Sequence, residues 1–132
     1  MRPWGASALI GGIGVDGPAL WLVEPNGVSH GYFATAVGKG ARAAKSELEK
    51  LDLKEMTVNQ LVDELTRIIY FAHDEAKDQD KPFVVELGWA GPASNNNFDI
   101  VPDDVRQAAI KKAEEALNAR DDSDDDDDDM DK

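Results

Sequence analysis

A lysine between two glycines, Gly38-Lys39-Gly40, is the first group of residues in this sequence that could bind a ligand. A Walker-type phosphate loop has the form G-x-x-x-x-G-K-[ST], in which the early glycine opens the loop and the final hydroxyl binds Mg²⁺. Here Phe33 stands in the place of the early glycine, and Gly40 stands in the place of the hydroxyl. The segment therefore predicts a corner between a strand and a helix, and not a nucleotide site.

A second glycine pattern, Gly12-x-Gly14-x-x-Gly17, matches the dinucleotide-binding fingerprint letter for letter. That fingerprint binds pyrophosphate only when a helix follows it, because the phosphates lie at the helix N-terminus. Pro18 and the strand-type residues 19–24 follow instead. We expect a glycine-rich hairpin at this point and no cofactor.

The histidines could act in catalysis or metal binding, but the chain has only His30 and His73. The segment 73–78 lacks the second histidine that H-E-x-x-H requires, and the chain contains no cysteine. A G-x-S-x-G nucleophile elbow is also missing from the sequence. We therefore predict no catalytic residue, no cofactor-binding residue and no metal ligand.

Ser123 lies within an acidic run and is a candidate for modification. Asp126 provides the acidic residue three positions later that kinases of the casein kinase 2 type prefer. Phosphate would add about −1.5 to −2 charges to an already negative segment, and would tune its binding to basic partners. An unmodified segment that only aids solubility is the alternative.

The charge of the chain is concentrated at its C-terminal end. The formal net charge is −13 over 132 residues, and residues 121–132 contribute −8 of it. An acidic body without a basic stripe argues against nucleic acid or an anionic membrane as a partner. We expect one folded domain over residues 1–120 and a disordered acidic tail over residues 121–132, in a soluble protein of the cytoplasm and nucleus.

The first third of the chain has the apolar pattern of strands at residues 5–14, 19–24 and 28–37. Asn26-Gly27 is a strong signal for a tight turn between the second and the third. The connections are too short for anything but antiparallel hairpins.

Helical periodicity begins at Lys39 and returns after Thr57, where Gln60 completes a capping box. Residues 82–89 and 98–101 again have strand character, and Pro102 begins a last helix that extends through Leu117. Helices are thus segregated from antiparallel strands, which is an α+β pattern.

Several motifs of this chain resemble the second half of proteasome alpha-type subunits, in the same order. They cover about residues 2–120 and comprise Arg2-Pro3-Trp4-Gly5, Asp16-Gly17-Pro18-x-Leu20-Trp21-x-x-Glu24-Pro25-x-Gly27, Ala36-Val37-Gly38-Lys39-Gly40 with the following ARAAKSELEKL, LKEMTVNQLVDEL, FVVELGW and FDIVPDDVRQAA. The acidic segment after a helix rich in Lys and Glu is most similar to one branch of these subunits.

The resemblance implies the N-terminal-nucleophile hydrolase fold, an αββα sandwich of two antiparallel sheets between layers of helices. It also implies a non-catalytic structural subunit of the outer alpha ring of the proteasome core particle, which serves ubiquitin-dependent protein degradation. Catalysis in that assembly belongs to beta-type subunits, whose nucleophile is an N-terminal threonine. The implied partners are other alpha- and beta-type subunits and regulatory particles.

Gating residues and the activator-binding lysine of the family lie in its first half, so none is carried over to this chain. Without the strands of that half, we expect exposed strand edges and apolar faces. The alternative function is a stand-alone acidic adaptor that binds basic proteins through the Asp-rich tail.

Overall fold

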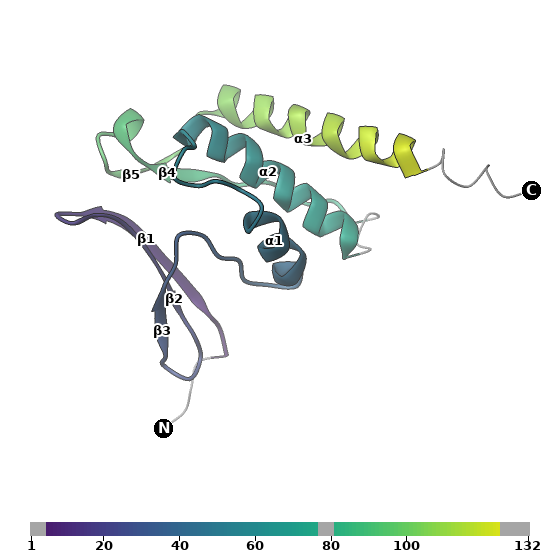
Figure 1. The fold of residues 1–132 in the computed structure, drawn as a ribbon. Coiled ribbons are helices and arrows are strands. Elements are labelled where there is room, and N and C mark those ends of the chain that lie inside the picture. The colour runs from purple at the N-terminus through teal and green to yellow at the C-terminus, as the bar shows by residue number, and fades with distance from the viewer. Residues whose placement is uncertain (1–4, 77–80, 125–132) are drawn as a thin grey trace, which may run out of the picture.

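The computed structural model describes residues 5–76 and 81–124. Its elements are β1 (Ala8–Gly14), β2 (Gly17–Val23), β3 (Ser29–Gly31), α1 (Ala41–Leu48), α2 (Val58–Glu75), β4 (Gly88–Ala90), the 3₁₀ helix η1 (Pro92–Ser94), β5 (Phe98–Ile100) and α3 (Asp103–Asp124). Helices and antiparallel sheets occur together (Figure 1), which confirms the α+β class. The Arg2-Pro3-Trp4 part of the first motif lies outside the described residues.

Strands β1, β2 and β3 form one antiparallel sheet in that order, which we call sheet A. Gly14 pairs with Gly17, so the second glycine pattern is a tight hairpin, as the sequence predicts. The turn between β2 and β3 also follows the prediction. Gly27 adopts a φ of +84°, and the side-chain oxygen of Asn26 accepts a hydrogen bond from Val28 N at 2.9 Å.

The third predicted strand, residues 28–37, is wrong in length because only Ser29–Gly31 is a strand. After Tyr32, whose N–H donates to Leu20 O at 2.9 Å, the chain leaves the sheet. Ala34 and Ala36 then pack against the cluster formed by α1 and α2. Small residues at these positions therefore serve helix packing and not the continuation of the sheet.

The Gly38-Lys39-Gly40 segment is the predicted corner before α1. Gly38 has a φ of +105°, which side chains rarely allow. A Cβ at Gly40 would lie 3.0 Å from Ala72 Cβ and 3.2 Å from Ala72 O, so glycine lets the start of α1 approach α2 closely. Helix α2 begins at the predicted capping box of Thr57 and Gln60.

The second sheet, sheet B, contains only β4 and β5. The strand predicted at residues 82–89 is therefore mostly wrong, since the structure has a strand only at Gly88–Ala90. Residues 82–87 extend past the end of β5, and a hydrogen bond joins Val101 N to Leu87 O at 3.0 Å. Strand propensity alone does not make a strand where a neighbouring strand is missing from the described residues.

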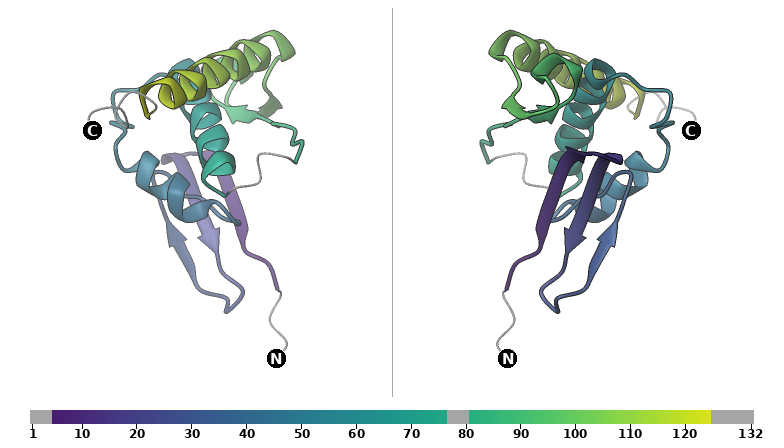
Figure 2. Two further views of the ribbon diagram at one scale, coloured as in Figure 1. Left: turned by 90° about the vertical axis from the view of Figure 1, so that its right-hand side faces the viewer. Right: turned by 90° about the vertical axis from the view of Figure 1, so that its left-hand side faces the viewer.

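Helices α2 and α3 lie side by side on sheet B (Figure 2). The two helices run in the same direction, because Asp63 binds Lys112 and, further along both helices, Glu75 binds Arg120. Helix α3 reaches Asp124, four residues into the segment that the sequence assigned to the tail. A helix adds one hydrogen bond for each residue by which it grows, so it continues past the last apolar position. Residues 125–132 of that predicted tail lie outside the described part.

Two small clusters form the core. Ala44, Leu48, Ile68 and Ala72 join α1 to α2. Val62, Val101 and Ala109 join α2, sheet B and α3, with Leu87 and Trp89 at the edge of the cluster. Among the residues whose burial the structure describes, Thr66 is the largest side chain that is fully buried, so the apolar area that holds the elements together is modest.

Candidate functional site

Sheet A has one face toward the helices and one face toward solvent. On the helix side, Leu9 lines a pocket of about 390 Å³ together with Ala44 and Ile69. Side chains alternate along a strand, so the neighbours of Leu9 point the other way. There Ile10 and Trp21 are directly paired and are 58% and 47% exposed. We call this the open face of sheet A, formed by Ala8, Ile10, Gly12, Ala19, Trp21 and Val23.

Sheet B repeats this arrangement. Val101 packs against Val62 and Ala109 of the helices. Val85 and Val101 are 5% and 3% exposed. Val84, in the segment before β4, and Phe98 and Ile100, in β5, are 80%, 77% and 72% exposed. We call these three residues the open face of sheet B. Apolar residues therefore occupy both faces of both sheets, although the helices of the described ranges cover only one face of each.

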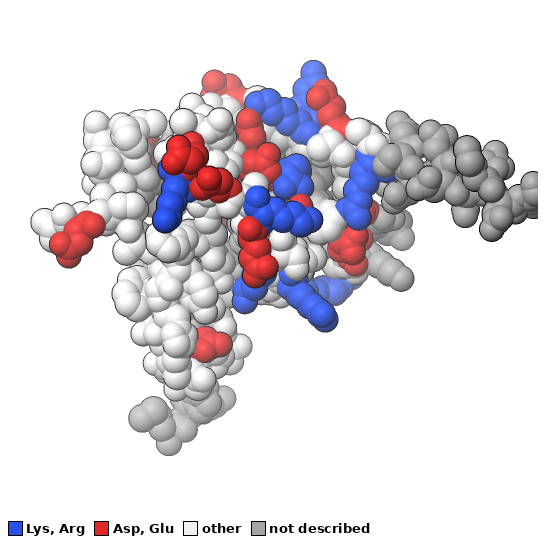
Figure 3. Space-filling model, in the orientation of Figure 1, with Lys and Arg blue, Asp and Glu red and all other residues white. Residues whose placement is uncertain are grey.

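Charged residues are almost absent from sheet A and its loops. Residues 5–38 contain only Asp16 and Glu24 as charged residues. In Figure 3 the part of the molecule that holds sheet A is nearly free of charge, whereas basic and acidic side chains gather over the helices. A large apolar surface with so little charge is typical of a surface that another polypeptide covers.

An ionic network holds α1 against α2. Glu47 is 9% exposed and binds Lys50, and it also accepts a hydrogen bond from Arg67 Nη1 at 3.1 Å. Arg67 Nε in turn donates to Glu64 at 2.9 Å. The bond from Lys50 lowers the pKa of Glu47 against the effect of burial, and Arg67 adds to the lowering. Burial alone would lower the pKa of Arg67, but Glu64 and Glu47 raise it.

Polar and aromatic contacts join α2 to α3. Lys112 Nζ lies 2.6 Å from Asp63 Oδ2, and the guanidinium of Arg120 lies 4.7 Å from the ring centre of Phe71. Burial raises the pKa of Tyr70, and the nearby carboxylate of Glu114 adds to the effect. Together with the network around Glu47, these contacts join α1, α2 and α3 to one another.

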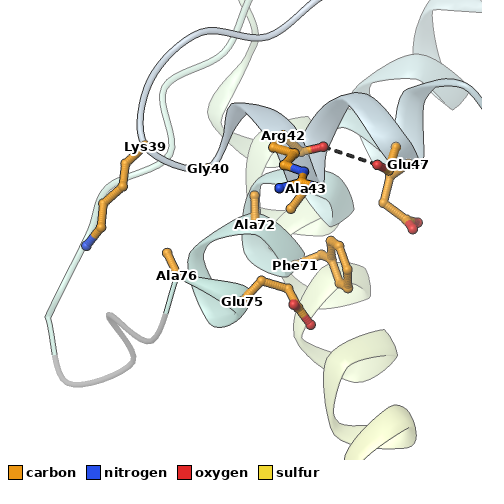
Figure 4. Close-up of a pocket in the computed structure, with 10 residues that line it drawn as sticks. Lys39, Gly40, Arg42, Ala43, Glu47, Phe71, Ala72, Glu75 and Ala76 are labelled. Atoms are coloured by element: carbon orange, nitrogen blue, oxygen red, sulfur yellow. Dashed lines mark hydrogen bonds between the residues drawn. The ribbon is translucent and has the colours of Figure 1, made fainter.

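The pocket beside the Gly38-Lys39-Gly40 corner is the place where a phosphate would have to bind. It measures about 430 Å³, and its walls include the carboxylates of Glu47 and Glu75 as well as Arg42. Lys39 extends away from Arg42 (Figure 4). The basic side chains do not converge on one point, so the geometry does not support phosphate binding.

The two histidines lie in separate places. His30 packs edge-on against Tyr32 with 6.5 Å between the ring centres, and His73 stacks on Phe83 at 4.1 Å. Within residues 5–76 and 81–124, no group of three His, Asp or Glu side chains is placed to hold a metal ion. Both histidines thus take part in aromatic packing.

Ser123 lies in the last turn of α3. Asp126, the acidic residue that would direct a kinase to it, lies outside the described residues. The phosphorylation hypothesis is therefore not tested by the geometry. None of the helices in the described ranges has the length and apolar character needed to cross a membrane.

The open faces are the features that sequence reasoning identified only in general terms. Phe98 and Ile100 are two positions apart in residues 98–101, which is a signal for one apolar face. Val84 and Val85 are adjacent and equally apolar, so the sequence does not tell which of them is exposed. The contact between Glu47 and Arg67 joins residues 20 positions apart and had no local signal.

Comparison with known proteins gives concordant results. A sequence profile of the family described as "Proteasome subunit" matches residues 1–89. The chain is 46% identical over 122 residues to proteasome subunit alpha type-3 of Acanthamoeba castellanii, which covers 92% of this chain and 48% of that protein. It is also 46% identical over 121 residues to the alpha type-3 subunit of Arabidopsis thaliana, with 92% and 48% covered.

The alpha type-3 subunit of Dictyostelium discoideum is 47% identical over 117 residues, which cover 89% of this chain and 46% of that protein. The chain thus spans about half the length of the curated relatives it matches. The relatives bear the name of the branch that the acidic segment indicated.

Proposed function

The chain belongs to the proteasome subunit family, and on that premise we propose that it is a non-catalytic structural subunit of the outer alpha ring of a proteasome core particle. In this role it contributes to assembly and to ubiquitin-dependent protein degradation. Its partners are other alpha- and beta-type subunits, together with regulatory particles that dock on the ring. Its location is the cytoplasm and the nucleus.

The open faces are the observation that carries this proposal. Val84, Phe98 and Ile100 are each more than two-thirds exposed, and an exposed apolar face of this kind is typical of a surface that another polypeptide covers. In a large assembly, neighbouring subunits can cover such a face. A free-standing protein has to tolerate the exposure or associate with itself.

The arrangement of layers supports the finer fold assignment, the αββα sandwich of N-terminal-nucleophile hydrolases. Within residues 5–76 and 81–124, each sheet has helices on one side, and its other side is apolar. Two sheets that pack face to face with helices outside would bury those open faces. This sandwich is the architecture in which we place the chain.

The proposed domain division keeps residues 1–120 as part of that fold and residues 121–132 as an acidic tail. Helix α3 extends through residues 121–124, so the proposed division passes through the last turn of that helix. We retain phosphorylation of Ser123 as a proposal, which mass spectrometry of the endogenous protein tests. A peptide found only unmodified under all growth conditions would remove it.

The alternative function, an acidic adaptor that binds basic proteins through its Asp-rich tail, receives no support from the relatives named above. The two functions predict different results when salt is added and when the tail is deleted. A partner of the adaptor would dissociate with added salt and would be lost on deletion of residues 121–132. A ring subunit would keep its partners after that deletion, because the open faces are apolar.

Native size fractionation of the tagged chain from its own cells, followed by mass spectrometry, tests the proposed function. We expect the chain in a very large particle with other alpha- and beta-type subunits. Phe98→Ser should shift it out of that particle, whereas Val28→Ser, at a 42% exposed position in a turn, should not. Migration of the unchanged chain without any proteasome subunit would overturn the proposal.

A further inference from the structure

The turn between β2 and β3 contains an asparagine in a position where it can react with its own backbone. Among the asparagines of the chain, only Asn26 is followed by glycine. Glycine has no Cβ, so its backbone nitrogen is the one that a neighbouring side chain approaches with the least steric hindrance. Residues 25–30 are exposed, and solvent base and water therefore reach both Asn26 and Gly27.

We propose that Asn26 is a site of spontaneous deamidation, in which the backbone nitrogen of Gly27 attacks the side-chain amide. The product is aspartate or isoaspartate at position 26. This inference does not depend on the proposed function, because it rests on the geometry of one turn alone. All of the hydrogen bonds that it involves join residues 24–28 to one another.

The reaction has two steps and needs only water as a reactant. Gly27 N loses its proton to solvent base and forms a bond to Cγ of Asn26, while the bond from Cγ to Nδ2 breaks and the amide nitrogen takes a proton and leaves as ammonia. This step gives a cyclic imide. Water then attacks one of the two ring carbonyl carbons, and the bond from that carbon to Gly27 N breaks. Attack at Cγ gives aspartate, whereas attack at the main-chain carbonyl carbon gives isoaspartate.

Two hydrogen bonds of the turn have opposite effects on the first step. Val28 N donates to Oδ1 of Asn26 at 2.9 Å, so a donor already lies where negative charge develops during the attack. Gly27 N donates to Glu24 O at 2.9 Å, and this bond has to open before the nitrogen can react. Bonds in an exposed turn open by local fluctuation. We therefore expect the turn to slow the reaction by no more than about tenfold relative to an unstructured peptide, which is the effect of one net hydrogen bond.

The two products have different consequences for the turn. Aspartate keeps a side-chain oxygen that accepts the hydrogen bond from Val28 N. Isoaspartate inserts a methylene group into the main chain inside the loop that is closed by the bond from Glu24 N to Val28 O. The isoaspartyl form should therefore lose this turn and weaken β3, which pairs with β2 at three positions. Hydrogen exchange of residues 20–31 should be faster in the isoaspartyl form than in the variant Asn26→Asp.

Peptide mapping by mass spectrometry tests the proposal on the purified full chain, kept in mildly alkaline buffer. We expect the peptide that contains Asn26 to gain the mass difference between a hydroxyl and an amino group, and to separate into an aspartyl and an isoaspartyl form. The other asparagines should stay unchanged over the same time; they are Asn59, Asn95, Asn96, Asn97 and Asn118. A synthetic peptide of residues 23–31 gives the unstructured reference rate. Complete conversion of that peptide while Asn26 of the folded chain stays intact would overturn the proposal.

Ala119→Gly is the matched control, because it creates the same pair of residues at Asn118, within α3. There the N–H of residue 119 belongs to the hydrogen-bond ladder of a helix, so Asn118 should convert at least about tenfold more slowly than Asn26 of the same chain. Gly27→Ala should slow the conversion of Asn26 several-fold, since a Cβ hinders the attacking nitrogen. Circular dichroism verifies that both variants are folded. Equal rates at Asn26 and Asn118, or an unchanged rate in Gly27→Ala, would refute the proposed reaction.

Discussion

Glu47 shows how a single acidic side chain acquires a structural role. Its carboxylate is nearly buried between α1 and α2, where Lys50 and Arg67 compensate its charge. A buried carboxylate without such partners would be strongly destabilising. The ion pair of Glu47 and Arg67 joins α1 to α2, so we assign it to helix packing.

The lowered pKa of Glu47 predicts a pH dependence of stability. The folded state favours the charged carboxylate, so its contribution is complete above the ordinary value of 4.5 and is lost as pH falls through the lower folded-state pKa. Glu47→Gln should reduce the free energy of unfolding by about 1 kcal/mol near neutral pH. The difference in the free energy of unfolding between this variant and the natural chain should shrink toward zero in acid.

Urea unfolding at a series of pH values, followed by circular dichroism, measures this difference. Glu49→Gln is the control, because Glu49 is exposed and lies immediately after α1. A difference between the natural chain and Glu47→Gln that stays constant down to strongly acidic pH would contradict the assignment.

Gly40 is the second residue whose role depends on its neighbour in space. Gly40→Ala would bring a methyl group to 3.0 Å from Ala72 Cβ, and the backbone of α2 cannot move away easily. We expect a loss of about 1–3 kcal/mol in the free energy of unfolding, as in other overpacked cores. Gly12→Ala is the control, since its Cβ has no neighbour within 4 Å. Equal effects of the two variants in thermal unfolding would refute the close contact.

At the scale of elements, α2 organises the molecule. It contacts α1 on one side and α3 on the other, and its residues belong to both core clusters. The start of α2 is fixed locally, because Thr57 and Gln60 satisfy each other's backbone N–H groups. The local cap and the tertiary packing are therefore both compatible with a helix that begins at Val58.

Thr57→Ala removes the hydroxyl that accepts a hydrogen bond from Gln60 N at 3.3 Å. The loss of this cap should lower the free energy of unfolding by about 1 kcal/mol. Thr57→Ser keeps the hydroxyl and should stay close to the natural chain. Urea unfolding monitored by far-UV circular dichroism measures both variants, and an equal loss in the two would show that the cap does not contribute.

At the scale of the whole molecule, the balance between buried and exposed apolar surface is unusual. The two clusters bury mostly small residues, while Val84, Phe98 and Ile100 remain in solvent. Folding of the single chain thus leaves much apolar surface in contact with water, and burial of that surface would be a further favourable contribution to the free energy. This remaining surface is the physical basis for the assembly that we propose.

An environment-sensitive dye such as bis-ANS provides a test at this scale. The purified chain should bind the dye, and the triple variant Val84→Thr, Phe98→Thr, Ile100→Thr should lower the fluorescence several-fold, about in proportion to the apolar area removed. The control carries threonine at Val15, Val28 and Val37, which are exposed but lie outside both open faces. Equal fluorescence of the two triple variants would show that the dye does not report the open face.

The sequence by itself determined the local features of this protein. Two turns and one helix cap form between residues a few positions apart, so they follow from residue type. They are the hairpin at Gly14 and Gly17, the turn at Asn26-Gly27 and the cap of Thr57 with Gln60. The motif order likewise pointed to the family. Tertiary structure alone decided how far the strands extend at residues 32–37 and 82–87, and which of Val84 and Val85 is buried. It also decided that Glu47 meets Arg67 across two helices. These outcomes depend on the neighbours that folding brings into contact, and residue type at a position does not specify those neighbours.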